Sequence, residues 1–148
     1  MFDLQNAMRL VGVKLNTKVD DRGNGLYRID VPLTYNDGTN RYQFVWARVS
    51  KNITRDGKDT LYFQSRVGVL NPNICLKTLL KEAYYGIYTM ICIVDELNEE
   101  NENEEMVYVQ ASPILDYSCN NDLIYDCVME CAIVADYLEK KYWGVDIH

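Results

Sequence analysis

The chain has 148 residues, of which 48% are hydrophobic and 25% are charged, and its net charge is −7. These values are typical of a single domain, residues 1–148, with a buried core, and they argue against general disorder. No apolar run approaches the roughly 20 residues that span a bilayer, and no basic, apolar leader opens the chain. We therefore expect a cytoplasmic protein without a membrane partner.

The charge is unevenly distributed. Residues 1–74 hold 11 Lys and Arg against 7 Asp and Glu, whereas residues 75–148 hold 4 against 15. An acidic chain is repelled by phosphate backbones, so a nucleic-acid partner is not expected. A small basic patch in the first half remains an alternative.

Metal and cofactor chemistry finds little support in the sequence. The cysteines are Cys75, Cys92, Cys119, Cys127 and Cys131, and the one histidine is His148. Cys127 and Cys131 lie one helical turn apart and could place two thiolates on one metal, but small core residues on a buried helix face are the simpler interpretation. We predict no metal site, no cofactor and no catalytic residue.

The first half of the chain predicts one helix and three strands. Residues 2–15 show the period of an amphipathic helix, and residues 16–25 are polar and predict a turn region. Residues 26–33, 41–49 and 61–70 then alternate apolar and polar side chains between short turns that contain Asp-Gly. This pattern is typical of an antiparallel meander.

The second strand can turn either of two faces to the core. Tyr42, Phe44 and Trp46 alternate there with Val45, Ala47 and Val49. If the aromatic face is exposed, it is a candidate partner-binding surface, because large rings bury much area at a low entropic cost. That candidate face consists of Tyr42, Phe44, Trp46, Tyr62 and Tyr108. Alternatively, the aromatic face packs in the core, or a second copy of the chain covers it.

Residues 71–86, NPNICLKTLLKEAYYG, predict a central helix with both ends marked. Asn71 suits the N-cap, Pro72 the first helical position and Gly86 a left-handed stop. Its apolar stripe consists of Leu76, Leu79, Leu80, Ala83 and Tyr84. The stripe is a candidate dimer contact, or it covers the protein's own sheet.

Two more strands are predicted after this helix. Residues 87–94 are apolar on both faces, which is typical of a strand inside a sheet, and residues 106–115 predict a second strand, in which Pro113 marks an edge position or the end. Residues 96–105, ELNEENENEE, are acidic but lack the ligand spacing and the central glycine of an EF-hand. They predict a solvated hairpin loop rather than a calcium site.

The longest helix is predicted over residues 120–143. Asn120 or Asn121 can cap its first turn, and Gly144 supplies the stop. The predicted fold is therefore α+β, with a single antiparallel five-stranded sheet and three helices in the order α-β-β-β-α-β-β-α.

Besides this order of elements, short sequence motifs within residues 31–70 resemble those of a known family. They are Asp37-Gly38 after the first strand, Arg41, Gln43 and Val45 at the start of the second, and Ser65, Val67 and Gly68 in the third. Together with residues 135–139 and Gly144, these phrases resemble the YbjN-like branch of the type III secretion chaperone-like fold. There, a DG turn, an Arg-x-Gln-x-Val segment and a Ser-x-Val-Gly phrase follow in this order.

The resemblance implies a non-enzymatic protein. Secretion chaperones of this fold are small acidic homodimers that hold a segment of a partner protein through apolar patches and exposed strand edges. Their central helix commonly contributes to the dimer contact, and YbjN-like members are described as regulators of sensory transduction. We therefore expect a chaperone-like or regulatory homodimer with a protein partner. A signalling regulator or scaffold without chaperone activity is the alternative, and an enzyme is a third hypothesis, for which the chain shows no recognisable catalytic constellation.

Overall fold

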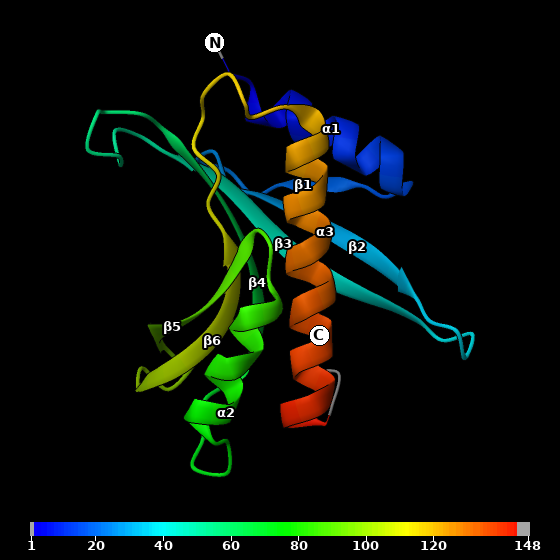
Figure 1. Ribbon diagram of the computed structural model, residues 1–148, viewed down its shortest axis with the longest axis vertical. Helices are drawn as coiled ribbons and strands as arrows, with labels where there is room; N and C mark the ends of the chain where they lie inside the picture. Colours follow the sequence, from blue (N-terminus) through cyan, green and yellow to red (C-terminus); the bar gives the residue numbers. More distant parts are fainter. Residues whose placement is uncertain (1, 145–148) are drawn as a thin grey trace.

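The computed structural model describes residues 2–144 and has an α+β fold with one antiparallel six-stranded sheet (Figure 1). In chain order the elements are α1 (Leu4–Leu15), β1 (Val19–Asp21), β2 (Tyr27–Thr34), β3 (Asn40–Ser50), β4 (Thr60–Val69), α2 (Leu76–Lys81), the 3-10 helix η1 (Glu82–Tyr85), β5 (Thr89–Leu97), β6 (Asn103–Ala111), α3 (Asn121–Leu138) and the π-helical turn η2 (Glu139–Trp143). The strand order is β1-β2-β3-β4-β6-β5.

All three α-helices contribute to a single hydrophobic core on one face of the sheet. Figure 1 shows α3 crossing in front of the sheet, with α1 near its upper end and α2 beside its lower half. The fully buried strand residues of this core alternate along each strand: Ile29 and Val31 in β2, Val45 and Ala47 in β3, Leu61 and Phe63 in β4, and Val107, Val109 and Ala111 in β6. We call the opposite face the open sheet face.

The sheet has one more strand than the five predicted. Val19–Asp21 forms β1 inside the region predicted as a turn, and it pairs antiparallel with the start of β2. Asn24, with a φ of 56°, and its neighbouring glycines reverse the chain between the two strands. A three-residue strand is too short to show alternation, so the sequence does not reveal it.

The central helix starts later than predicted. Asn71 does not cap it. Instead, the carbonyl oxygen of Asn71 accepts the Ile74 amide at 3.0 Å, and its side chain accepts the Asn73 amide at 2.9 Å. These bonds close a separate turn, and α2 begins at Leu76. The Asn-Pro-Asn segment is therefore a tight turn before the helix, because its capping groups are used within the turn itself.

The end of the central helix also differs from the prediction. The last turn tightens into η1, and Gly86 has a φ of −74°, so it is not a left-handed stop. A Cβ atom at Gly86 would lie 2.8 Å from the carbonyl oxygen of Thr89. The glycine is needed here because the chain approaches itself closely, not for its conformational freedom.

A β-bulge in β4 interrupts the alternation that the sequence predicts for this strand. The register with β6 shifts between Arg66 and Gly68, so that Gly68 lies opposite Val107 rather than continuing the alternation. A Cβ atom at Gly68 would lie 2.6 Å from Nε1 of Trp143, whose indole N–H donates to the Val69 carbonyl at 2.9 Å. The bulge thus makes room for the indole ring that docks the C-terminal turn on the sheet.

The last helix follows the prediction closely. The Asn120 side chain accepts the Leu123 amide at 2.9 Å and caps α3, and Gly144, with a φ of 70°, ends the π-helical turn. Pro113 lies after the end of β6, which is an interior strand between β4 and β5. His148 lies outside the described residues.

Candidate functional site

The predicted aromatic face is the open sheet face. Val45 and Ala47 are fully buried on the helix-covered side, so Tyr42, Phe44 and Trp46 project to the other side. Tyr62 and Tyr108 also alternate with buried core residues of β4 and β6, and they join the same face. Tyr42 is 55% exposed, and the other four side chains are half-buried. The alternative that these rings fill the core is therefore wrong.

Arginine side chains cover part of this aromatic surface. The guanidinium of Arg28 lies 4.4 Å from the ring centroid of Phe44, and that of Arg48 lies 4.5 Å from the ring centroid of Tyr62. Arg28 also forms salt bridges of 3.0 Å with Asp20 and 3.2 Å with Asp30. The open sheet face is thus a mixed surface of rings and paired charges, with stacked rather than bare rings.

The sequence contains a signal for this stacking. Arg28 lies directly opposite Trp46 in the register of β2 and β3. The alternation that places the aromatic residues on one face of β3 also places Arg28 and Asp30 on that face of β2.

Tyr108 anchors the other end of the open sheet face. Its phenol donates a short hydrogen bond to the Glu96 carboxylate, which also forms a 3.1 Å salt bridge with Arg66. Burial and the adjacent Glu96 carboxylate raise the pKa of Tyr108 well above its ordinary value. The phenol therefore stays protonated and serves as a hydrogen-bond donor.

The predicted dimer stripe is divided between two sides of the helix. Leu79 is fully buried in the core, and Ala83 is half-buried. Leu76, Leu80 and Tyr84, spaced four residues apart, are exposed, and Tyr84 is 86% exposed. The helix therefore both covers its own sheet and presents an apolar row to the outside.

Exposed apolar residues continue past this helix towards β5. We call the whole set the α2–β5 surface: Leu76, Leu80, Tyr84, Tyr85, Ile87 and Tyr88. Ile87 alone is 80% exposed. Sequence reasoning missed the second half of this surface, because the apolar run at 87–94 was interpreted as an interior strand, whereas β5 is an edge strand.

A carboxylate from α3 holds the segment that carries this surface. Glu130 accepts the backbone amides of Ile87, Tyr88 and Thr89 at 3.0, 2.7 and 2.7 Å. Three consecutive amides aimed at one carboxylate define the path of the chain into β5. The exposed side chains of Ile87 and Tyr88 are therefore displayed in a fixed position.

A second contact ties η1 to the C-terminal turn. The ammonium of Lys141 lies 2.5 Å from the Glu82 carboxylate, and the Tyr142 hydroxyl donates to the same oxygen at 2.8 Å. The hydrogen bond from Lys141 lowers the pKa of Glu82 below its ordinary value. Glu82 is therefore ionised near neutral pH.

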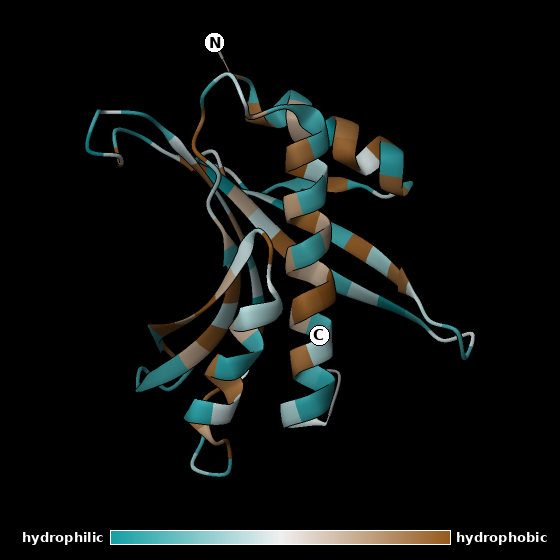
Figure 2. Cartoon of the chain, in the orientation of Figure 1, coloured by the Kyte–Doolittle hydropathy of each residue, from teal (hydrophilic) through white to brown (hydrophobic). Residues whose placement is uncertain are grey.

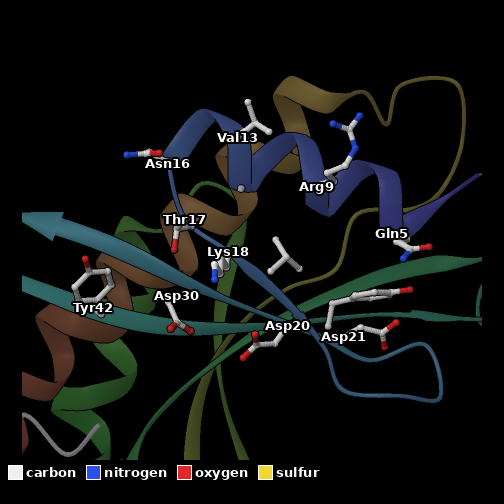
Figure 3. A pocket seen from close by; sticks show the side chains of 13 residues that line it. Gln5, Arg9, Val13, Asn16, Thr17, Lys18, Asp20, Asp21, Asp30 and Tyr42 are labelled. Atoms are coloured by element: carbon white, nitrogen blue, oxygen red, sulfur yellow. The ribbon is translucent and has the colours of Figure 1, made fainter.

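A groove separates α1 from β1 and β2 and has a volume of about 1060 Å³. Figure 3 shows Arg9 and Val13 on α1 above it and Asp20, Asp30 and Tyr42 on the strands below. Asp20 and Asp30 are salt-bridged to Arg28, so these two carboxylates of the groove have a structural role in the sheet.

The cysteines of α3 lie in the core, as the simpler interpretation predicted. Burial raises the pKa of the Cys127 thiol to about 12, and that of Cys131 rises still higher. The Cys131 thiol donates to the Phe63 carbonyl at 3.6 Å. Within residues 2–144, no group of three or more His, Cys, Asp or Glu side chains has an arrangement that could hold a metal ion.

Comparisons with protein-family models, with curated proteins and with solved structures give no match. Among the described helices, none is both long and apolar enough to cross a membrane.

Proposed function

We propose that the protein is a non-enzymatic, chaperone-like or regulatory protein-binding module that acts as an acidic homodimer and holds a segment of a partner protein. One observation carries this proposal: the α2–β5 surface leaves six large apolar side chains exposed. Removal of apolar surface from water is the main favourable term in most protein association. Exposed apolar patches of this kind mark protein contacts more often than other sites.

The dimer contact is assigned to the row of Leu76, Leu80 and Tyr84. A two-fold dimer uses the same patch on both copies, so it requires a self-complementary surface. Side chains four residues apart form a ridge that packs into the groove of an identical helix. The proposed likeness to the type III secretion chaperone-like fold is supported by the element order α-β-β-β-α-β-β-α, which the chain follows apart from the additional strand β1.

The partner segment is assigned to the open sheet face. It carries Tyr42, Phe44, Trp46, Tyr62 and Tyr108. The helices α2 and α3 pack on the other face, and α1 borders Tyr42 across the groove. Half-buried rings and stacked arginines bind both the apolar and the polar groups of an extended chain.

Light scattering at micromolar concentration tests the dimer. We expect the wild type to have twice the 17.2 kDa mass of one chain, and Leu80→Glu to be a folded monomer because it places a charge in the interface. Val13→Glu changes an exposed apolar residue of α1 in the same way, and should leave the dimer intact. A monomeric wild type contradicts the proposal.

Tyr84→Ser provides a second test if Leu80→Glu unfolds, because the Tyr84 side chain is almost completely exposed. Native purification with a tagged chain tests the partner segment. Capture of a partner through a short extended segment supports the chaperone-like function, whereas capture of a folded domain that is independent of the open sheet face supports the scaffold alternative.

A further inference from the structure

β5 is an edge strand whose first part, residues 89–94, carries no charged side chain. It pairs with β6 over nine residues in one unbroken register, and its other side faces no described strand. Its sequence, TMICIVDEL, contains no proline and no lysine, and the pairing contains no bulge. Natural edge strands commonly use these three features to prevent pairing with another chain. Their absence leaves a long, partly apolar edge ready to accept a strand.

The available part of this edge begins at Met90. The amides of Ile87, Tyr88 and Thr89 are already bound by Glu130. Met90 and Val94 are exposed on the open sheet face, and Leu97 is exposed at the far end of the strand. A chain added at β5 would therefore extend the open sheet face by one strand.

The far end of β5 is strongly acidic. Seven carboxylates occur between residues 95 and 105, namely Asp95, Glu96, Glu99, Glu100, Glu102, Glu104 and Glu105. Residues 82–139 contain no lysine or arginine. In Figure 2 the hairpin end is hydrophilic, whereas hydrophobic colour marks much of β5.

The acidic turn has a defined conformation. The side-chain oxygen of Asn98 accepts the amides of Glu100 and Glu102, both at 2.9 Å, and Asn101 adopts a left-handed conformation with a φ of 59°. The carboxylates are therefore held beside the end of the edge strand, where they create a local negative potential.

We propose that a basic, extended part of the partner adds to β5 as an antiparallel strand, at the edge of the open sheet face rather than over its rings. This inference rests on the proposed partner-binding function and names the chemistry of the partner. Antiparallel pairing continues the pattern of the sheet and is slightly more stable than parallel pairing. It places the N-terminal end of the peptide beside the acidic hairpin, so the basic residues lie at that end, and alternating apolar residues follow along Met90–Val94.

A second copy of the chain fits this edge less well. Two antiparallel β5 strands would place Asp95 and Glu96 of each copy beside the apolar first half of the other. Such pairing removes water from carboxylates without supplying a cation. Charge complementarity therefore favours a basic peptide over self-pairing.

Labelled peptides and fluorescence anisotropy test the proposal. The probe is Lys-Lys-Lys-Val-Thr-Val-Thr-Val-Thr, compared with a version that carries three glutamates, a version with the lysines at the C-terminus, and a version with alternate N-methylated amides. We expect the first peptide to bind at least tenfold more tightly than the other three. Binding should also weaken as salt rises, because surface charges are screened.

Two double variants locate the charge effect. Glu99→Gln with Glu100→Gln should weaken the binding of the lysine peptide several-fold. Asp122→Asn with Asp126→Asn removes the same charge from the exposed side of α3 and should leave the binding unchanged. Equal losses in both double variants would show general electrostatic attraction and overturn the proposal.

Other outcomes separate this inference from the proposed function. Equal binding of the lysine and glutamate peptides overturns the basic partner, but it leaves a segment-binding module in place. Strong binding of the N-methylated peptide overturns strand addition. The lysine peptide could also fail to bind while the β5 amides are protected from hydrogen exchange at high protein concentration and lose this protection on dilution. That result assigns the edge to a second copy of the chain and overturns the proposal.

Discussion

Replacement of Glu130 by alanine removes the carboxylate that holds residues 87–89 at the entrance to β5. Its three amide contacts are 2.7–3.0 Å long. A hydrogen bond to a charged group contributes about 1.5–3 kcal/mol, but water can solvate the released amides because Glu130 is only half-buried. We therefore expect Glu130→Ala to lower the free energy of unfolding by about 2–3 kcal/mol.

Glu130→Gln should have a smaller effect, of about 1 kcal/mol. In the wild type both carboxylate oxygens of Glu130 accept hydrogen bonds from backbone amides. Glutamine keeps one of these acceptor oxygens, but its side-chain NH₂ group replaces the other and would face backbone N–H groups, with which it cannot form a hydrogen bond. Both variants should weaken the dimer less than Leu80→Glu does, because they leave the row of Leu76, Leu80 and Tyr84 intact and release only the neighbouring Ile87 and Tyr88.

Urea denaturation at one protein concentration measures the stability term, since dimer formation makes the midpoint depend on concentration. Sedimentation or light scattering over a dilution series measures the dimer. Asp126→Ala, one turn earlier on α3 and exposed, is the matched control. Surface substitutions usually change the free energy of unfolding by no more than about 0.5 kcal/mol. If the losses for Glu130→Ala and Asp126→Ala agree within this range, the three amide contacts of Glu130 do not stabilise the fold.

Three further variants test other parts of the structure. Gly68→Ala should cost about 1–3 kcal/mol and shift the fluorescence of Trp143, because the new methyl group overlaps the indole; an unchanged thermal midpoint would contradict this packing. Asp136→Ala should cost about 3–5 kcal/mol in urea denaturation, because it removes a carboxylate that lies 2.9 Å from the partly buried Arg41 guanidinium. A loss of less than 1 kcal/mol would show that this pair behaves as a surface ion pair. The pKa of Glu82 is lowered on folding, so its contribution to stability is present above its usual value of 4.5 and is lost as the pH falls through the folded pKa. Glu82→Gln should therefore reduce the loss of stability between pH 5 and pH 3. If the free energy of unfolding of the variant has the same pH dependence as that of the wild type, the contact of Glu82 with Lys141 and Tyr142 does not stabilise the fold.

Much of the fold could be predicted from the sequence, because the signals are local. The alternation of Ile29 and Val31 with polar neighbours defines a strand with one buried face, and the Asn120 cap and Gly144 stop act within one helical turn. The acidic, Asn-rich tract contains the predicted turn between two strands, because the Asn98 side chain organises its own turn. The predicted loop over 96–105 was too long, since residues 96–97 belong to β5 and residues 103–105 to β6.

Features that depend on distant residues required the tertiary structure. β5 is apolar on both faces whether it lies inside the sheet or at its edge, and only the pairing order β4-β6-β5 makes it an edge strand. Gly68 departs from the alternation because the indole of Trp143 occupies the space beside it. The exposed side of Leu76, Leu80 and Tyr84 depends on where the helix lies on the sheet.

For the candidate site, the sequence determined which residues share a face, and the tertiary structure determined what covers each face. Alternation groups Tyr42, Phe44 and Trp46 with certainty, since successive side chains of a strand point in opposite directions. It does not say which side the helices choose. That choice depends on the sum of apolar area buried by α1, α2 and α3 against the Val45 and Ala47 face, a non-local quantity that no short window of sequence contains.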